Sequence, residues 1–408
     1  MVDSRDSKWK FILSLMMISI LFENLTIANI LGGALKFHHI VAILGIILCV
    51  FDGKLFINIK EFFISFFAIL IPLLPLHRIK DSQEFFKTYL IYVLFILFLL
   101  LCFKKLKNAF RSNYSFFYNF FVIIIEFAVL FGILQFIFNN AFDLSSLNNI
   151  FGDLEFQKLN PGIVQGFRRA NSIYHEPSYF GWICCLGLTL LLYDKNNFVK
   201  NKVLRYCLIL AGVAVSFSTA AYFVTVVLII SFFFLQENKL VTVVGMVSFL
   251  LIFLIFWNFA GISDVFNKVY TVRSEGTSSY ERFVSPFKYV INTFQHYPLF
   301  GRGMGQEGKI DLVGTVGRYD SVNNSIFGVF VVFGTTALFY IVLYFRTFFK
   351  YAKNDKLSLI FLIMTFGMYL STGAFLAFDT AIILIACLLT IREETLCYNY
   401  LPDMEGVY

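Results

Sequence analysis

Twelve apolar segments divide the chain of 408 residues, and they limit its possible folds more strictly than any other feature. Hydrophobic residues make up 59% of the sequence and charged residues only 14%, whereas about 25% is usual for soluble domains. Only lipid can cover so much apolar surface. We therefore predict an all-α, polytopic membrane protein with about twelve transmembrane helices in a single integral membrane domain, residues 1–408. The expected spans are residues 11–31, 37–51, 61–76, 88–103, 116–138, 179–193, 203–217, 220–235, 240–260, 325–345, 357–372 and 377–391.

One long apolar stretch has to be divided. Residues 206–235 include 30 positions without a charged side chain. A single helix of this length would be about 45 Å long, well beyond the roughly 30 Å hydrocarbon core of a bilayer. Because Ser216, Ser218 and Thr219 lie near its middle, we expect two spans joined by a tight polar turn.

Lysine and arginine are concentrated in three segments between spans, residues 104–111, 194–205 and 346–356. Basic connecting segments usually lie in the cytoplasm. With twelve spans and a cytoplasmic N-terminus, all three fall on the cytoplasmic side of a bacterial inner membrane, and both termini do as well. Two long segments, 139–178 and 261–324, then form outer loops on the periplasmic side.

The placement of charged residues, cysteines and histidines argues against nucleic-acid binding, a disulfide framework and a metal site. The net charge of +7 is explained by the cytoplasmic segments, so we expect no nucleic-acid partner. None of the seven cysteines lies in an outer loop, so we expect no disulfide framework there. His38-His39 has no companion ligands, and we predict neither metal nor cofactor. Lys8-Trp9-Lys10 before an apolar run imitates a signal peptide, but we expect an uncleaved first span.

The first outer loop ends in a compact set of polar residues. Arg168 and Arg169 are followed by Glu176-Pro177-Ser178 directly before an apolar span. Proline is tolerated in the first turn of a helix and serine can cap it, so a helix should begin here. Glu176 either has a chemical role or only caps the helix and pairs with an arginine. The arginine pair either binds substrate or binds lipid headgroups.

The second outer loop predicts an amphipathic helix on the outer membrane surface. Its apolar stripe recurs at helical spacing and consists of Phe283, Phe287, Val290 and Phe294. Ser278 and Glu281 have the spacing of a capping box, but Pro286 either kinks that helix or marks a later start at Ser285. In both cases Arg282 lies near a helix start, where backbone N–H groups favour anions.

Arginines in both outer loops suggest a polyanionic ligand. A guanidinium group holds phosphate oxygens bidentately and stays charged at any physiological pH. At a partly desolvated bilayer surface this attraction is stronger than in bulk water. For a protein embedded in lipid, we predict a lipid-linked pyrophosphate.

The order of these segments resembles the Wzy/WaaL superfamily, and in particular the Wzy-type O-antigen polymerases. In that family an Arg stands about seven residues before a Glu/Asn-Pro that opens a span, as Arg169 stands before Glu176. A Ser-rich turn between spans follows, matched by residues 216–219. Next comes an Arg upstream of a Pro-Leu-Phe-Gly-x-Gly run, matched by Arg282 and residues 298–303.

The last family motif is where this chain departs from the pattern. Ligases of the superfamily show a His-Asn pair that opens a span, with a Gly downstream. In this chain Asn324 and Gly334 match the pattern, but Asn323 stands where the ligases have His. A carboxamide cannot act as a general base near neutral pH. This favours a polymerase over a ligase.

The resemblance implies a GT-C-like glycosyltransferase that needs neither metal nor nucleotide sugar. It would transfer a growing glycan from undecaprenyl pyrophosphate to the next lipid-linked repeat unit. Arg169 and Arg282 would stabilise the leaving pyrophosphate, and the candidates for a general base are Glu176, His175 and Asp320. The residues expected to bind substrate are Arg168, Asn171, Tyr174, Arg302 and Asn324. Expected partners are the lipid-linked oligosaccharide, the membrane, and the chain-length regulator and flippase of the same pathway.

Three alternatives remain open: an O-antigen ligase, a twelve-span flippase for the repeat unit, and a receptor or scaffold without catalysis. A flippase often carries charges inside its helices and has two related halves, whereas the charges here gather in unequal outer loops. Glu126, inside the span 116–138, is either functional or hydrogen bonded between helices. We favour the hydrogen-bonded role.

Overall fold

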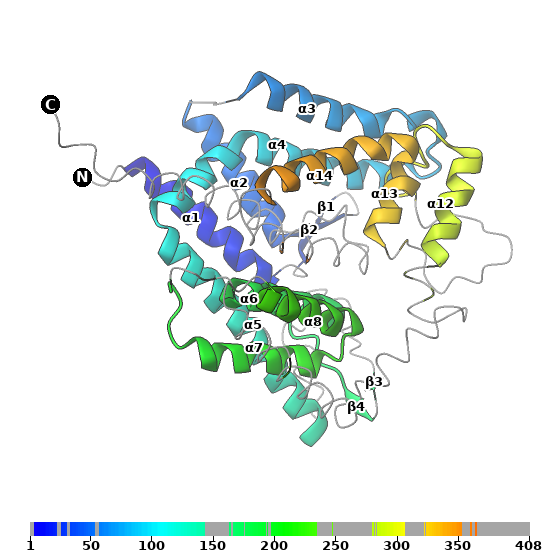
Figure 1. Cartoon of the computed structure of the whole chain (residues 1–408). Coiled ribbons are helices and arrows are strands. Elements are labelled where there is room, and N and C mark those ends of the chain that lie inside the picture. The colour runs from blue at the N-terminus through cyan, green and yellow to red at the C-terminus, as the bar shows by residue number, and fades with distance from the viewer. Residues whose placement is uncertain are drawn as a thin grey trace.

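The computed structural model describes the part of the chain given at the end of this paragraph (Figure 1). The predicted spans 240–260, 357–372 and 377–391 lie outside the described residues except for single positions. The described residues are 4–22, 26–30, 33–53, 57–142, 163–164, 166–174, 176–192, 194, 197–234, 247, 280, 282, 284–306, 322, 324–352, 360 and 364.

The described chain is mostly helical, as predicted. Its helices are α1 (Ser4–Ser19), α2 (Phe37–Phe51), α3 (Ile59–Leu70), α4 (Ser82–Ser112), α5 (Tyr114–Ala141), α6 (Pro177–Leu192), α7 (Lys202–Ser216), α8 (Thr219–Phe234), α12 (Ser285–His296), α13 (Ser325–Phe333) and α14 (Ala337–Ala352). Short 3-10 turns are η1 (Ile20–Phe22), η2 (Ile71–Leu73), η3 (Leu76–Arg78) and η7 (Gly334–Thr336). Two antiparallel pairs of strands complete it, β1 (Thr26–Ile30) with β2 (Gly33–Lys36) and β3 (Ile163–Val164) with β4 (Phe167–Arg168).

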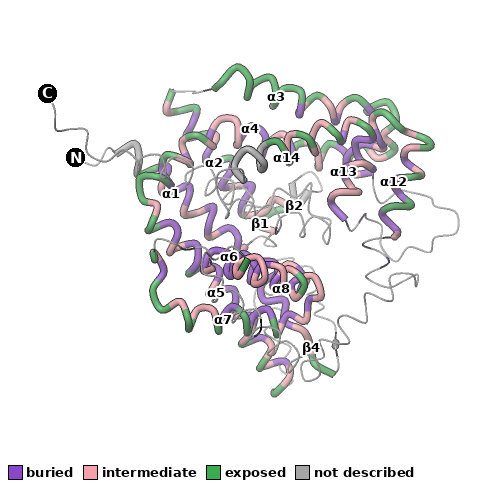
Figure 2. Tube along the Cα trace, viewed as in Figure 1, coloured by how far each residue is buried: buried purple, intermediate pink, exposed green. Residues whose placement is uncertain are grey.

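Four helical stretches among the described residues are long and apolar enough to cross a membrane. They are Ile59–Arg78, Ser82–Ser112, Tyr114–Ala141 and Ser325–Arg346. Helices α2, α6 and α8 are apolar but shorter. Figure 2 shows α3 largely exposed, and its exposed side chains include Phe62, Phe63, Phe66 and Phe67. Such an aromatic surface is suited to lipid rather than water, as expected of a polytopic membrane protein.

Helix α6 is at the centre of the core. It is buried along almost its whole length and packs against α5, α7 and α8. Gly181 allows the close approach to α8, because an added Cβ there would lie 2.5 Å from the Cβ of Ala221. Small residues at such contacts let helix backbones approach closely in membranes.

The first predicted span, 11–31, is wrong in its second half. Helix α1 ends at Ser19, and after η1 the chain pairs with itself as β1 and β2. The β-branched residues Thr26, Ile27 and Ile30 favour extended backbone. Hydrogen bonds between the two strands satisfy backbone groups that a helix would have satisfied within itself.

The basic segment 104–111, predicted as a loop, is helical. It forms the end of α4, and only Asn113 separates α4 from α5. No Gly or Pro interrupts the segment, and Lys, Leu and Arg are good helix formers. Helix α4 has 31 residues, which is about 46 Å at the usual rise per residue. Its basic end can therefore extend beyond the hydrocarbon core while remaining helical.

The predicted break between the seventh and eighth spans is confirmed. Helix α7 ends at Ser216, Phe217 adopts a left-handed conformation with φ of 45°, and α8 begins at Thr219. The Ser216 hydroxyl accepts from the N–H of Ser218 (3.3 Å), and the Ser218 hydroxyl accepts from the N–H of Ala221 (3.4 Å). Two serine side chains therefore satisfy backbone groups at the start of α8.

Helices α12 and α13 lie side by side and run in the same direction. The rings of Phe287 and Phe327 are 6.0 Å apart, and those of Phe294 and Phe330 are 6.1 Å apart. The predicted amphipathic helix is therefore present, with Ser285 as its start. Phe287 and Phe294 of its apolar stripe pack on α13, which the sequence did not predict, and Phe283 lies outside the described residues. We call this pair the α12–α13 platform.

The predicted span 325–345 contains a sharp bend. Figure 1 shows α13 running across the direction of α14, and Gly334 in η7 between them has φ of 57°. The segment after α12 is hydrogen bonded to this bend. The N–H of Arg302 donates to the carbonyl of Val331 (2.9 Å). The N–H of Gly303 donates to the carbonyl of Val332 (3.0 Å).

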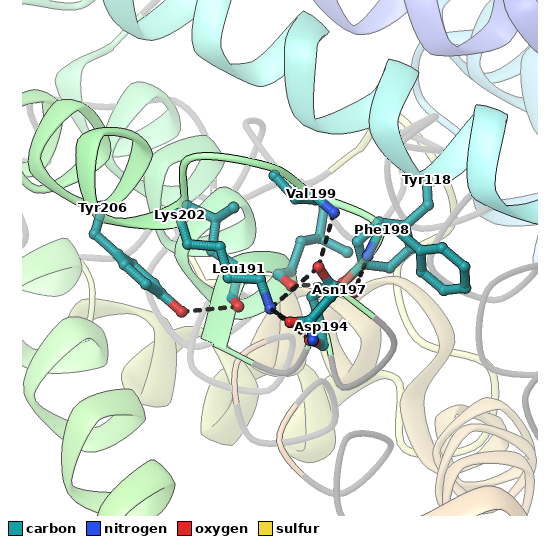
Figure 3. A network of polar contacts seen from close by, with 9 residues as sticks. Tyr118, Leu191, Asp194, Asn197, Phe198, Val199, Lys202 and Tyr206 are labelled. Carbon is teal, nitrogen blue, oxygen red and sulfur yellow. Dashed lines mark hydrogen bonds and ion pairs between the residues drawn. The ribbon is translucent and has the colours of Figure 1, made fainter.

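The turn between α6 and α7 is built around Asp194 (Figure 3). Its carboxylate accepts from the N–H groups of Phe198 (3.1 Å) and Val199 (2.9 Å), and Lys202 Nζ lies 3.3 Å from it. Lys202 also donates to the Asn197 side chain (2.8 Å). One acidic residue therefore organises an irregular basic segment that the sequence places in the cytoplasm.

Polar contacts join connecting segments that are far apart in the sequence. Asp52 lies 3.7 Å from Lys8 and 3.3 Å from Lys105, and all three residues are predicted to be cytoplasmic. Gln306 accepts from the N–H of Asp81 (3.2 Å), and both are predicted to be on the outer side.

Gly301→Ala is expected to destabilise the platform. Gly301 has φ of 64°, and an added Cβ would lie 2.5 Å from the backbone nitrogen of Gly334. A cost of about 1–3 kcal/mol is usual for a strained backbone of this kind, so the melting temperature of the purified protein should fall. Gly328→Ala is the control, because a Cβ there meets nothing within 4 Å. Equal melting temperatures for the two variants would contradict this account.

Candidate active site

Arg169 lies between β4 and α6, against the turn that joins α7 to α8. Its Nε donates to the carbonyl of Ser216 (3.1 Å), and the N–H of Ala170 donates to the carbonyl of Val215 (3.0 Å). The last carbonyls of a helix have no partner within the helix. This part of the first outer loop therefore completes the end of α7, and the two sequence motifs meet.

The backbone before α6 is held by two amide side chains from the end of α5. Buried Gln135 accepts from the N–H groups of Asn171 (3.1 Å) and Ser172 (2.8 Å). Asn140 accepts from the N–H of Arg168 (2.7 Å) and donates to its carbonyl (2.9 Å). Ser172 has φ of 54°, which is uncommon for a residue other than glycine. Neither amide was predicted from the sequence, where polar residues near the end of an apolar span were the available signal.

Glu176 joins the two outer loops. Its carbonyl accepts from the N–H groups of Tyr179 and Phe180, so it opens α6 as the sequence predicted. Its Oε2 accepts from the Ser178 hydroxyl (2.9 Å) and from Nη2 of Arg282 (3.3 Å). The Glu176 side chain is 46% exposed and that of Arg282 is 23% exposed, so solvent and small ligands can reach this ion pair.

Arg169, Glu176 and Arg282 form one charged group, which we call the arginine site. Burial, and after it the positive charge of Arg282, lower the pKa of Arg169 to about 10, although the negative charge of Glu176 acts in the opposite direction. Arg169 therefore stays protonated at neutral pH. Arg282 pairs with the Glu176 carboxylate, and Arg169 lies within electrostatic range of both. Two guanidinium groups near one carboxylate leave an excess of positive charge, which favours an anion with several oxygens.

Asn324 connects Arg282 to the α12–α13 platform. Its Oδ1 accepts from the N–H groups of Ile326 (3.1 Å) and Phe327 (3.2 Å), as an N-cap of α13 does. Its Nδ2 donates to the carbonyl of Arg282 (3.0 Å). One buried amide therefore fixes both the start of α13 and the backbone that carries Arg282.

Three residues expected to bind sugars, Asn171, Tyr174 and Asn324, are buried. Asn171 Nδ2 donates to the carbonyl of Tyr174 (2.6 Å). Among the described residues, Asn171 Oδ1 is buried and has no hydrogen-bond partner. Direct contact of these three side chains with substrate stays a prediction.

Arg302 lies at the other end of the platform from Arg282. Its Nε donates to the Thr293 hydroxyl (3.3 Å), its Nη2 donates to Asn292, and its guanidinium carbon is 5.5 Å from the ring centre of Tyr297. The remaining residues singled out from the sequence, His175, Asp320 and Asn323, lie outside the described residues.

Other ionisable residues have partners within the helices. Glu126 of α5 accepts from Arg205 of α7 at 2.9 Å, so it is hydrogen bonded between helices as we favoured. The rings of His38 and His39 pack edge to face, 4.4 Å apart. In the part of the chain that the structure describes, no group of three or more His, Cys, Asp or Glu residues could hold a metal ion.

Several long apolar helices define a helical, polytopic membrane protein, and its arginine site lies in the segments next to the helix ends. The chain belongs to the WcaD colanic acid polymerase family, whose model matches residues 11–393. No curated protein sequence matches it. The family is of the polysaccharide polymerase type that the sequence resemblance predicted, with glycosyltransferase-type activity, and this favours the polymerase over the ligase and the flippase.

Substitution of Asn324 should separate its two tasks. Asn324→Ser keeps an oxygen that can cap α13 but loses the amide that donates to Arg282. We expect a melting temperature near that of the unchanged protein and weaker binding of inorganic pyrophosphate, measured by titration calorimetry. Asn324→Ala should also lose about 1 kcal/mol of stability, because the cap is gone. Unchanged pyrophosphate binding by the serine variant would rule out this role in positioning Arg282.

Proposed function

We propose that this protein is a surface-polysaccharide polymerase of the bacterial inner membrane. It transfers a growing glycan from undecaprenyl pyrophosphate to the next lipid-linked repeat unit on the periplasmic face. The arginine site is the observation that carries the proposal, because Arg169 and Arg282 come from segments far apart in the sequence and both lie within electrostatic range of Glu176, with which Arg282 forms an ion pair. Membership of a polymerase family supports the same reaction.

The reaction exchanges one bond for another at the anomeric carbon of the donor. A hydroxyl oxygen of the acceptor attacks this carbon, and a new glycosidic C–O bond forms. The bond from the carbon to the pyrophosphate oxygen breaks, and its electron pair leaves with the pyrophosphate. Negative charge grows on the leaving group, so Arg169 and Arg282, with Arg168 beside them, would stabilise the transition state more than the bound substrate.

The hydroxyl proton needs an acceptor as the new bond forms. A positioned general base typically contributes about 10²–10⁴-fold to the rate. Glu176 is our first candidate, because its half-exposed carboxylate lies in the arginine site itself. His175 is its neighbour in sequence, and Asp320 lies in the second outer loop. Neither metal nor cofactor is required in this scheme, and the fold is proposed to be GT-C-like.

The protein would work between two others of the same pathway. A flippase would deliver the lipid-linked repeat unit to the outer face, and a chain-length regulator would limit the growing polymer. Both partners follow from the proposed reaction, since the substrate is made in the cytoplasm and the product is a chain.

Deletion of the gene should replace long surface glycan chains by single repeat units, because transfer to the next unit fails. Arg169→Ala and Arg282→Ala should each reproduce the deletion while the protein still accumulates in the membrane. Arg346→Ala, at an exposed arginine on the predicted cytoplasmic side, is the control and should leave the chains unchanged. The readouts are gel electrophoresis of the surface glycan and immunoblotting of the membrane fraction.

Each other outcome of this experiment has a definite meaning. Normal long chains from either outer-loop variant would remove that arginine from the mechanism. Long lipid-linked chains that are not passed on would indicate a ligase. Complete absence of repeat units on the outer face would indicate a flippase.

Arg169→Lys should make the activity depend on pH. The surroundings that lower the pKa of Arg169 to about 10 would also lower that of a lysine below its ordinary value, about 10.4. Deprotonation removes the charge, so polymerisation by this variant in membrane vesicles should fall as pH rises from about 7 to about 9. The unchanged protein should keep a constant rate over that range. Parallel profiles for the two proteins would show that the charge of this residue is not used.

A further inference from the structure

A second group of basic side chains lies around the ring of Tyr297, apart from the arginine site. The guanidinium carbon of Arg78 is 5.6 Å from the centre of this ring, and that of Arg302 is 5.5 Å from it. Both distances are in the range of cation–π attraction. Because both distances are measured from the same ring centre, the distance between the two guanidinium carbons cannot exceed their sum. Each therefore raises the positive potential at the other, and an anion between them would relieve their repulsion. We call this group the Tyr297 cluster.

The cluster is assembled from two parts of the chain that are far apart in sequence. Arg78 ends η3, between α3 and α4, whereas Arg302 follows α12 in the second outer loop. Buried Gln306 connects the two parts: its Oε1 accepts from the N–H groups of Lys80 and Asp81, both at 3.2 Å, and its Nε2 donates to the Asp81 carbonyl (3.0 Å). A ligand would therefore meet preorganised cations.

Among the residues that the structure describes, positive charge dominates around the cluster. Arg78 and Lys80 are exposed. The nearby acids have other interactions, because Asp81 caps α4 by accepting from the N–H of Glu84 (3.1 Å), and Glu84 pairs with Lys87 (3.2 Å). The cluster therefore suits an anion with several oxygens, as the arginine site does.

The α12–α13 platform separates the two basic sites. Asn324, at the start of α13, bonds to the backbone of Arg282, and Val331, near the end of α13, bonds to that of Arg302. The seven residue steps from Asn324 to Val331 amount to about 10 Å of helix. Both sites are built from segments that the sequence places on the outer side of the membrane.

The proposed reaction requires two lipid-linked pyrophosphates at the same time. The donor loses its pyrophosphate, whereas the acceptor keeps its own, and the repeat unit lies between that pyrophosphate and the attacking hydroxyl. The second pyrophosphate therefore has to be held on the same face but away from the reacting carbon.

We propose that the Tyr297 cluster holds the pyrophosphate of the acceptor, with Arg78 and Arg302 as its cationic ligands, while the arginine site holds that of the donor. This proposal rests on the proposed polymerase function. A lipid-bound phosphate is also present in phospholipid headgroups, so the test has to distinguish the two sources.

The test uses the full-length protein in micelles of an uncharged detergent, with farnesyl diphosphate as the probe. The unchanged protein should bind two molecules of probe. Arg78→Gln should weaken the binding of one of them about tenfold, the effect of losing one charge-assisted contact. Arg169→Gln should weaken the other, and Arg346→Gln should change neither. Arg78 carries the test because it is exposed, whereas Arg302 also packs against α12.

The outcomes distinguish this proposal from the one on which it rests. Two molecules bound equally by the unchanged protein and by Arg78→Gln would overturn the acceptor site and leave the polymerase proposal standing. Loss with Arg78→Gln but none with Arg169→Gln would support the cluster as a diphosphate site and count against the donor site. Displacement of the Arg78-dependent molecule by an equal concentration of phosphatidylglycerol would show a headgroup site and overturn the proposal. Resistance to phosphatidylglycerol would support it.

Discussion

In a bilayer every backbone N–H and C=O group needs a partner within the protein, and the described structure depends on this constraint. Helices meet it along their length, but each helix end leaves four groups without a partner in the helix. Side chains satisfy many of these groups here. Gln135 and Asn140 hold the segment before α6, Asn324 caps α13, Asp194 organises the turn after α6, and Gln306 joins two outer segments.

The same hydrogen bonds place the charges of the candidate active site. Arg169 completes the end of α7, and the backbone of Arg282 is bonded to the side chain that caps α13. The Arg169 guanidinium is held by the Ser216 carbonyl and that of Arg282 by Glu176. Burial and the positive charge of Arg282 together lower the pKa of Arg169. A site of this kind is preorganised for negative charge, which is what transfer from a pyrophosphate requires. The hydrogen bonds that complete the helix ends therefore also position the charged groups of the candidate active site.

Hydropathy located most of the described helices and even the break at Ser216–Thr219, because the preference of a segment for lipid depends on its own composition. It was wrong where neighbours decide the backbone. Residues 26–30 could pair with the strand that follows, and residues 104–111 could continue α4. Hydropathy also did not predict the role of Gln135, because the sequence does not show whether an amide side chain is buried or exposed.

Charge patterns selected Arg169, Glu176 and Arg282 from the sequence, but as members of two separate loops. By itself the sequence determined the class of protein, the order of most of its described apolar helices and which charged groups are available, because hydropathy and charge are properties of short stretches. Only the tertiary structure decided that Glu176 pairs with Arg282, that Asn324 holds the backbone of Arg282, and that Arg78 and Arg302 meet at one tyrosine ring. These contacts join residues distant in the chain, and they exist because packed helices bring particular ends together at hydrogen-bonding distance.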